Sequence, residues 1–505
     1  MRPNRSFRQI QYQNIHTYRC LCVCLVILAL LASCSNPTPT TQFTQPAPSV
    51  VAPMPSKTLT LVPATPSQAP RATVTPNTLI HLNPAILRGT SVQLWNAFSG
   101  DSGETFQQLV DQFNVENKFG IHIIAIYQGN YNDLYEKVDE ITSSSDFPDI
   151  TVANLYQILT WKDKGKNIVD LQPYINDSTW GLNQQEQADY YPNFWGNEDV
   201  SGMRLAIPAQ RTAALMAYNQ SWARELGFES PPATSEEFKV QACAAGRMNS
   251  KDSLSGNDGT GGWVTNTAPV TMLSWMYAYG AQIVNPTGSG YQFNTLQVKT
   301  AFTYLKSLYD AGCAWQAKNE TSTGGEGEGE HAEMEFATRQ ALFISLSLTD
   351  IPYLEKTLER VGNKDQWTVI AFPSTIKPAI TVSGPSYVLF NSSPEKQLAG
   401  WIFLKWFSSP QNQARWITTN GTFPLQSTTL DLLDNYAASH PQWLAAIQLL
   451  PYGRSEPTLA SWSLVRWVVS DVGTQIFRYY FTADRIPATL KLMDETAEEI
   501  LKYSP

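Results

Sequence analysis

Residues 383–416 read SGPSYVLFNSSPEKQLAGWIFLKWFSSPQNQARW, and NGTFPL follows at 420–425. The apolar, β-branched and aromatic residues over 380–391 predict a strand that Gly384 and Pro385 interrupt. Apolar residues then recur at helical spacing, which predicts two consecutive helices at 394–408 and 411–418. This stretch therefore combines a strand with helices, and the same combination extends outward from it in both directions.

The alternation is clearest between residues 90 and 165. Strands are predicted at 91–95, 121–127 and 149–153, and helices at 103–116, 131–141 and 156–164. This order predicts an α/β fold with a mostly parallel sheet covered by helices. Such sheets bind ligands beyond the C-terminal ends of their strands, so the first candidate ligand loops are 96–100, 128–130 and 154–155.

The remaining body continues the mixed pattern. Further strands are predicted at 203–208, 215–218, 340–345 and 367–372. Further helices are predicted at 235–245, 271–280, 296–311, 332–338 and 488–502. The segments 255–262 and 324–330 are rich in glycine and are interpreted as loop insertions.

Charge is distributed unevenly along the chain. Its 505 residues include 35 basic and 44 acidic side chains, a formal net charge of −9. Residues 1–89 hold seven of the basic residues and no acid, so residues 90–505 carry 28 basic against 44 acidic residues, a net of −16. An acidic body argues against nucleic-acid binding, which needs a basic surface. Its length of about 415 residues is enough for two or three domains.

The first 33 residues have the features of an export signal. Four arginines precede an apolar run at 21–31, which is too short to cross a hydrocarbon core of about 30 Å but suits a secretory signal. The run ends in LASC at 31–34, which resembles the bacterial lipobox. We therefore expect 1–33 to be a lipoprotein signal peptide and Cys34 to be lipidated. An ordinary signal with a chance cysteine, or an uncleaved anchor, is the alternative.

Residues 34–89 are predicted to be a disordered tether. Eleven of the 32 prolines lie at 35–88, among Thr, Ser, Gln and Ala. Such a composition buries too little apolar surface to offset the loss of chain entropy. An extended segment of this kind would hold the body away from the membrane.

Two cysteines remain in the body, Cys243 and Cys313. Two cysteines in an exported protein often pair, and closing a loop of about 70 residues would contribute about 4 kcal/mol in the chain-entropy model. We expect this disulfide, with two buried thiols as the alternative. Two cysteines without clustered histidines do not suggest a zinc site, so neither a metal nor a cofactor is expected.

Several motifs, in this order, resemble one protein family. They are LWNAFSGDSGETFQQLVDQFN (94–114), IYQGNYNDLYEKV (126–138), FPDITVANLYQI (147–158), GMRLAIPAQRTAALMAYNQSWARELG (202–227), EFATRQALFISLS (335–347) and the opening stretch 383–425. Together they resemble the extracellular solute-binding proteins of ABC importers, in the maltose-binding and glycerol-3-phosphate-binding group. The resemblance covers about residues 90–502.

The resemblance implies a two-lobed, type II periplasmic-binding-protein-like fold. Lobe 1 would hold 90–209 plus 380–422, and lobe 2 would hold 213–372 plus 426–505. The chain would cross between lobes near 210–212, 374–379 and 423–426, and the lobes would close around a ligand. The protein would be a monomeric, lipid-anchored binding protein outside the cell, with no enzymatic activity, that delivers its solute to a membrane permease.

The resemblance also suggests ligand-binding residues. Sugar sites combine flat aromatic rings with hydroxyl, amide, charged and backbone partners. The candidates lie at strand ends, in the Tyr-x-Gly-x-Tyr pattern, at the first crossing and in later loops: Phe98, Ser99, Tyr131, Asn154, Arg211, Thr212, Trp263, Ser345, Ser347, Gly384, Ser386 and Arg454. For each of them a packing role is the alternative: hinge structure for Arg211, and a surface salt bridge for Arg454.

Some positions depart from the pattern of glycerol-3-phosphate binders. Thr-Ser-Glu-Glu at 234–237 stands where those proteins have Thr-Trp-x-Glu, and Gly-Thr-Phe-Pro at 421–424 replaces Gly-Tyr-x-Pro. Asn154-Leu155 stands where they carry an acid. A mono- or oligosaccharide, or a related polyol, is therefore the favoured ligand class.

Two other classes of function remain open. An exported glycoside hydrolase would need two carboxylates facing one cleft, and acidic residues are plentiful here. No Gly-x-Ser-x-Gly or His-Glu-x-x-His motif is present, however. A structural surface lipoprotein is the third possibility, and it predicts no response to any ligand.

Overall fold

A computed structural model of the chain describes residues 80, 82–143, 146–317 and 329–503. The predicted signal peptide, Cys34 and most of the predicted tether lie outside the described residues. The end of the tether range is ordered, because Pro84–Leu87 (η1) forms a short 3-10 helix whose cap residue Asn83 accepts from the Ala85 N–H at 3.0 Å. Leu87 is buried in the core of the adjoining lobe. The folded body thus begins a few residues before position 90.

The first lobe is built on a five-stranded sheet in the order β2–β1–β3–β13–β6. Strand β1 pairs in parallel with β2 and β3, whereas β13 is antiparallel to both β3 and β6. The strands are β1 (Ser91–Asn96), β2 (His122–Tyr127), β3 (Ile150–Ala153), β6 (Ile207–Pro208) and β13 (Ser386–Leu389). Every residue of β3 is buried, as expected for a central strand with helices on both faces.

The second lobe is built on a seven-stranded sheet in the order β14–β12–β7–β10–β8–β9. Strand β11 pairs with the end of β7 that β12 leaves free. The strands are β7 (Thr212–Asn219), β8 (Gly261–Val264), β9 (Ala314–Trp315), β10 (Ala341–Ser347), β11 (Trp367–Ile370), β12 (Ile380–Ser383) and β14 (Gly453–Ser455).

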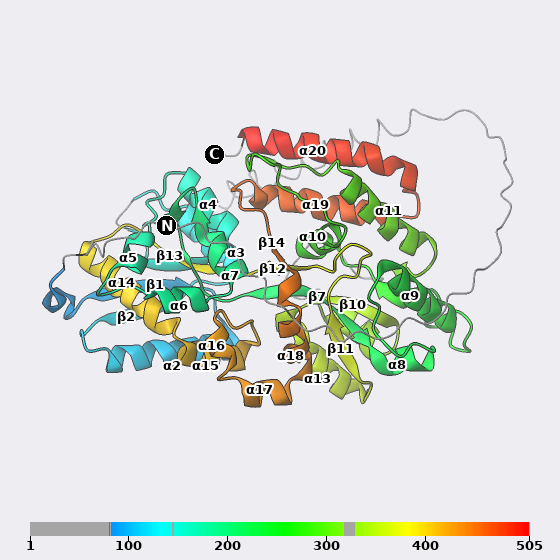
Figure 1. Cartoon of the computed structure of the whole chain (residues 1–505), viewed down its shortest axis with the longest axis horizontal. Coiled ribbons are helices and arrows are strands. Elements are labelled where there is room, and N and C mark those ends of the chain that lie inside the picture. Colours follow the sequence, from blue (N-terminus) through cyan, green and yellow to red (C-terminus); the bar gives the residue numbers. More distant parts are fainter. Residues whose placement is uncertain (1–79, 81, 144–145, 318–328, 504–505) are drawn as a thin grey trace, which may run out of the picture. The chain divides into compact units, whose positions relative to one another are not determined.

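Helices surround both sheets (Figure 1). Those of the first lobe are α2 (Gly100–Glu116), α3 (Tyr131–Asp139), α4 (Leu155–Asp163), α5 (Gln172–Asn176), α6 (Gln184–Asp189), α7 (Pro192–Trp195), α14 (Pro394–Phe407) and α15 (Pro410–Asn420). The others are α8 (Gln220–Glu225), α9 (Ser235–Asn249), α10 (Pro269–Ala278), α11 (Leu296–Asp310), α12 (Gly329–Ala337), α13 (Ile351–Val361), α16 (Ser427–Leu430), α17 (Asp434–Ser439), α18 (Pro441–Gln448), α19 (Trp462–Ile476) and α20 (Ile486–Tyr503).

Residues 383–416 begin at the last residue of β12 and form β13, α14 and most of α15 in succession. Helix α14 begins with Pro394 at its first turn, where the missing N–H costs nothing. Its buried face includes Trp401 and Phe407, and the Trp401 Nε1–H donates to the Trp180 carbonyl at 2.9 Å. Apolar spacing therefore places this helix against the first sheet and its core.

The Gly384-Pro385 interruption separates strands of two different sheets. Residues 380–383 pair with β7 of the second sheet, whereas β13 pairs with β3 and β6 of the first. The second crossing therefore lies at Gly384 and Pro385, downstream of the range 374–379 expected for it. The expected start of lobe 1 at residue 380 differs from this pairing, because the strand before the interruption belongs to the other sheet.

Three clusters of buried apolar residues stabilise the body. One fills the first lobe and one fills the second. The third covers the other face of the second sheet, since Leu215 of β7 belongs to it and the next residue, Met216, belongs to the second-lobe cluster; it extends to Phe194 and Phe423 near the first lobe. The predicted partners Cys243 and Cys313 form a disulfide that connects α9 to the residue before β9, with Cα atoms 4.2 Å apart. Within the described residues, no helix is both long and apolar enough to cross a membrane.

Candidate functional site

The passages from β6 to β7 and from β12 to β13, where the chain changes sheets, meet at Arg211, whose exposed fraction is 2%. Its Nη1 donates to the carbonyls of Gln210 and Pro385, both at 2.8 Å, and to that of Gly384 at 3.2 Å. Its own carbonyl accepts from the Phe423 N–H at 2.8 Å. Arg211 therefore holds the first and second crossing segments together and bonds to Phe423, in the range predicted for the third.

A buried carboxylate balances the charge of this arginine. The Arg211 Nη2 forms an ion pair with Glu198 Oε1 and donates to Ser386 Oγ at 3.0 Å, and the Ser386 hydroxyl donates to the same Oε1 at 2.8 Å. Burial raises the pKa of the Glu198 carboxyl and lowers the pKa of the Arg211 guanidinium, and each is opposed by the other's charge. Glu198, Arg211, Gly384, Pro385 and Ser386 are called the crossing cluster below.

Arg211 and Ser386 were predicted to contact ligand. Every hydrogen bond given above for them is made to the protein, which matches the alternative role of hinge structure for Arg211. Gly384 belongs to the same arrangement. Its φ is +143°, and an added Cβ would lie 2.4 Å from the Gln210 carbonyl oxygen, so only glycine fits between the first two crossings.

Glu198 lies directly before a short hairpin that positions it in the crossing cluster. Strands β4 (Asp199–Val200) and β5 (Met203–Arg204) are joined by Ser201 and Gly202, which have φ values of 55° and 80°. Positive φ at both turn residues is the geometry that two-residue hairpins favour. Sequence reasoning missed Glu198, although the Ser-Gly pair at 201–202 is a turn signal.

A cavity of about 30 Å³ lies against the crossing cluster. Its volume matches the space of about one water molecule. Residues of both lobes line it: Asn154, Leu155, Tyr156, Asn197, Glu198, Arg211, Val382, Ser383, Gly384, Glu456 and Pro457. Of the predicted ligand residues, the structure thus brings Asn154, Arg211 and Gly384 to one site.

Side chains also meet across the cleft between the two lobes. The Nη1 of Arg466, on α19, donates to the hydroxyl of Tyr156, on α4, at 2.7 Å. Glu456 Oε1 accepts from the Trp462 Nε1–H at 2.9 Å and lies 3.6 Å from Arg466 Nη2. Burial raises the pKa of Tyr156 to about 12, so its hydroxyl stays protonated at neutral pH. None of these four residues was predicted to contact ligand, although Glu456 lies in the same PYGRSEP loop (451–457) as Arg454.

The predicted residues of the first lobe have different environments. Phe98 is buried, and its ring lies 4.9 Å from those of Phe106 and Trp416, so it is part of the core. Ser99 is exposed at the start of α2. The Tyr131 hydroxyl accepts from Gln210 Nε2 at 3.4 Å, which places it beside the first crossing.

Four of the predicted residues of the second lobe form two hydrogen-bonded pairs, and Arg454 belongs to neither pair. The hydroxyls of Thr212 and Ser347 lie 2.6 Å apart, which links the start of β7 to the end of β10. Ser345 Oγ accepts from the Trp263 Nε1–H at 3.3 Å. Arg454 is exposed on β14, with its guanidinium 5.0 Å from the centre of the Tyr277 ring rather than in a salt bridge.

The glycines next to Trp263 suggested a loop, but the residue lies in a strand. It is fully buried in β8, with Trp275, Phe477 and Phe238 around its ring. A Cβ on Gly262 would lie 2.0 Å from the Cys313 carbonyl oxygen, so the glycine marks a close approach of backbones. The structure therefore gives Trp263 a core position instead of the predicted stacking platform.

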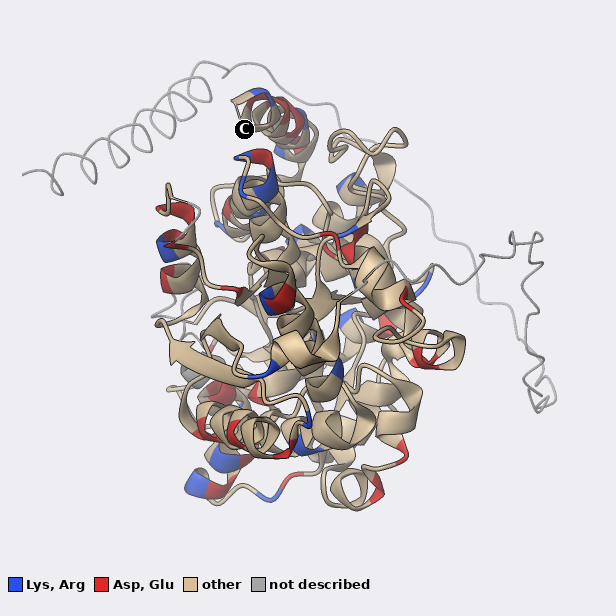
Figure 2. Ribbon diagram, turned by 90° about the vertical axis from the view of Figure 1, so that its left-hand side faces the viewer, with Lys and Arg blue, Asp and Glu red and all other residues tan. Residues whose placement is uncertain are grey.

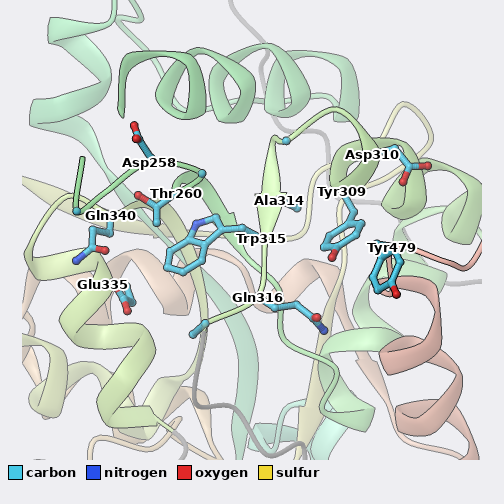
Figure 3. A pocket seen from close by; sticks show the side chains of 14 residues that line it. Asp258, Thr260, Tyr309, Asp310, Ala314, Trp315, Gln316, Glu335, Gln340 and Tyr479 are labelled. Carbon is cyan, nitrogen blue, oxygen red and sulfur yellow. The ribbon is translucent and has the colours of Figure 1, made fainter. Parts of the chain in front are cut away.

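A second cavity of about 800 Å³ lies at the edge strand β9. It shares no lining residue with the cavity at the crossing cluster. Figure 3 shows the Trp315, Tyr309 and Tyr479 side chains around it, with Asp258 and Glu335 among its polar groups. It includes none of the predicted ligand residues. It ends at Ala317, beside residues 318–328 that are outside the described part of the chain.

Acidic and basic residues are interspersed over the ribbon in the view of Figure 2, and the basic ones do not gather on one face in that view. Among the described residues, no group of three or more His, Cys, Asp or Glu side chains is placed to hold a metal ion. The polar groups that line the cleft are amides, hydroxyls, carboxylates and a guanidinium group.

Comparison with solved structures confirms the two-lobed α/β fold. The sugar-binding protein MalE of Xanthomonas citri has a TM-score of 0.69 at 21% identity, covering 82% of this chain and 98% of that one. The cyclic alpha-maltosyl-1,6-maltose binding protein of Arthrobacter globiformis has a TM-score of 0.67 at 18% identity, covering 82% and 99%. UgpB of Mycobacterium tuberculosis, in complex with glycerophosphocholine, has a TM-score of 0.64 at 16% identity, with the same coverage.

Sequence comparison identifies the family more directly. No curated protein matches the chain significantly. Residues 108–442, well over half of the chain, match the profile of a family described as bacterial extracellular solute-binding protein. The chain therefore belongs to the bacterial extracellular solute-binding proteins, as its ordered motifs predicted.

Proposed function

We propose that the protein captures a carbohydrate, a mono- or oligosaccharide or a related polyol, between its two lobes and delivers it to the permease of an ABC importer. The main support for this proposal is the cavity at the crossing cluster, because both lobes contribute polar side chains to it. Amide, hydroxyl and carboxylate groups beside aromatic rings are the partners that sugar hydroxyls and ring faces need. Three of the structurally similar proteins are named for maltose or a maltosyl sugar, which supports the same ligand class.

The size of the cavity fits a site that opens and closes around its ligand better than a permanently open pocket. About 30 Å³ holds one water, whereas a sugar needs several times that volume. The lobes must therefore separate for a ligand to enter, and the contact of Arg466 with Tyr156 must break or rearrange. Movement about the crossing segments between lobes is the hinge motion known for two-domain binding proteins.

A ligand screen tests this proposal. We expect at least one of glucose, maltose, maltotriose or trehalose to raise the melting temperature and change tryptophan fluorescence of the protein that begins at Cys34. At a concentration of 100 times Kd, binding to the folded state contributes about 2.7 kcal/mol. The variant Tyr479→Ala, changed at an 86% exposed side chain, serves as the control and should respond as the wild type does.

Two results would contradict the binding proposal. Hydrolysis of a panel member would show an enzyme instead of a carrier. Absence of any response to neutral sugars and polyols would favour a structural lipoprotein. In either case the two-lobed fold would stand, since it depends on the structure and not on the ligand.

We also propose that the protein is a monomer anchored to the outer side of the cell membrane through Cys34. The LASC sequence at 31–34 and the proline-rich segment that follows support this anchor. The expected result is that Cys34→Ala abolishes incorporation of labelled palmitate and moves the protein out of the membrane fraction. Unchanged membrane association of the variant, with the signal still present, would indicate an uncleaved anchor.

A further inference from the structure

Glu198 has one carboxylate oxygen that the crossing cluster does not use. Its Oε1 receives the Arg211 guanidinium and the Ser386 hydroxyl. Its Oε2 is buried and has no hydrogen-bond partner among the described residues. A buried acceptor without a partner costs stability, and the cost is greater for a charged group. A partner for Oε2 is therefore expected to come from outside the protein.

Glu198 also lines the small cavity between the lobes. The side chain itself is fully buried, so this cavity is the space from which a partner can approach. Asn154 and Tyr156 of the first lobe line the same space, and so does Glu456 after β14. A volume of about 30 Å³ holds one hydroxyl group or one water molecule.

The charges around the cavity determine which chemical groups it accepts. Two carboxylates line it, Glu198 and Glu456, and one guanidinium, Arg211. Both terminal nitrogens of Arg211 already donate to the crossing cluster, so this cation has little left to offer a ligand. Each carboxylate has a guanidinium beside it, Arg211 for Glu198 and Arg466 for Glu456, so the discriminating feature is the Glu198 Oε2 that has no partner among the described residues. The oxygens of a phosphate or carboxylate have no proton to donate to this acceptor, whereas a hydroxyl can donate to it.

We propose that Glu198 is a ligand-binding residue whose Oε2 accepts a hydrogen bond from a hydroxyl of a neutral sugar or polyol. This contact makes the cleft bind neutral sugars and polyols more tightly than their phosphorylated or acidic counterparts. This inference rests on the proposed function and deepens it, because it assigns the discriminating contact to one atom. The same residue supports the crossing cluster through Oε1, so one carboxylate joins ligand recognition to the joint between the lobes.

Matched ligands and variants test the inference by titration calorimetry. The probes are maltose with its aldonic acid maltobionate, and glucose with glucose 6-phosphate. We expect the wild type to bind the neutral member of a pair at least 10-fold more tightly. Glu198→Gln, which replaces the free acceptor with an amide, should weaken neutral binding by about 10- to 100-fold, the range for a hydrogen bond to a charged group, and reduce the neutral-to-acidic ratio by a similar factor.

Glu359→Gln is the control variant, because it makes the same change at an exposed residue of α13. It leaves both oxygens of Glu198 with their contacts. It should bind the neutral probes as the wild type does and change the neutral-to-acidic ratio less than 3-fold. If Glu198→Gln does not fold, Glu198→Asp keeps the charge but withdraws the acceptor by one methylene, and it should weaken neutral binding in the same direction.

The outcomes separate the inference from the proposed function. A wild-type preference for the anionic member, or an unchanged ratio in a folded Glu198 variant, overturns the inference alone. An unchanged ratio would mean that a resident water satisfies Oε2. Failure of every neutral probe across the sugar panel overturns the proposed function, and the inference with it.

Discussion

Replacing Arg211 with alanine is expected to lower the free energy of unfolding by about 3–5 kcal/mol, the range for breaking a buried ion pair. The substitution leaves the Glu198 carboxylate buried without its cation. It also removes the donor that holds the Gln210, Gly384 and Pro385 carbonyls together. Equilibrium unfolding in urea, followed by circular dichroism, measures the change.

Two further variants make this prediction specific. Arg454→Ala removes an exposed arginine and should change the free energy of unfolding by less than about 0.5 kcal/mol. The double variant Arg211→Ala with Glu198→Ala should be less destabilised than the sum of the single variants, because no charge is left unpaired. A loss below 1 kcal/mol for Arg211→Ala would mean that the crossing cluster does not hold the lobes together.

The second large effect is expected at Trp263. Trp263→Ala should cost about 3–5 kcal/mol of stability, since it empties a fully buried site among Trp275, Phe238 and Phe477. A core role predicts the same loss with and without bound sugar. Thermal unfolding of the variant at saturating and at zero ligand measures both quantities.

An exposed aromatic residue provides the comparison for Trp263. Tyr479→Ala removes a ring that is 86% exposed and should leave stability nearly unchanged. If Trp263→Ala instead kept wild-type stability and lost sugar binding, the tryptophan would be a ligand platform. The core placement of β8 would then be wrong.

Local pattern was sufficient to predict many helices and strands. The predicted strand at 121–127 and helix at 103–116 correspond to β2 and α2 within three residues at each end. This success has a physical cause, because apolar periodicity records which face of an element is buried. The α/β class followed from the same information, and the two sheets confirm it. The family came from the resemblance of the ordered motifs, and the family match confirms it.

Pattern was not sufficient where partners are distant in sequence. The segment 380–391 looked like one strand because both halves are apolar, but each half pairs in a different sheet. Trp263 was misplaced because glycine next to it indicates either a turn or a close backbone contact, and only the distant Cys313 decides between them. Glu198 was missed because its burial depends on Arg211 and Ser386.

The position of β13 has a consequence for biosynthesis. This strand lies between β3 and β6, so those two strands of the first lobe are not neighbours until β13 is present. Residues 209–385, which include most of the second sheet, must be synthesised before that gap closes. At about 5–20 residues per second, the wait is on the order of 10–40 s. The first sheet is therefore completed only after most of the second sheet has been synthesised, and a C-terminal truncation before residue 386 would leave an open sheet edge that invites aggregation.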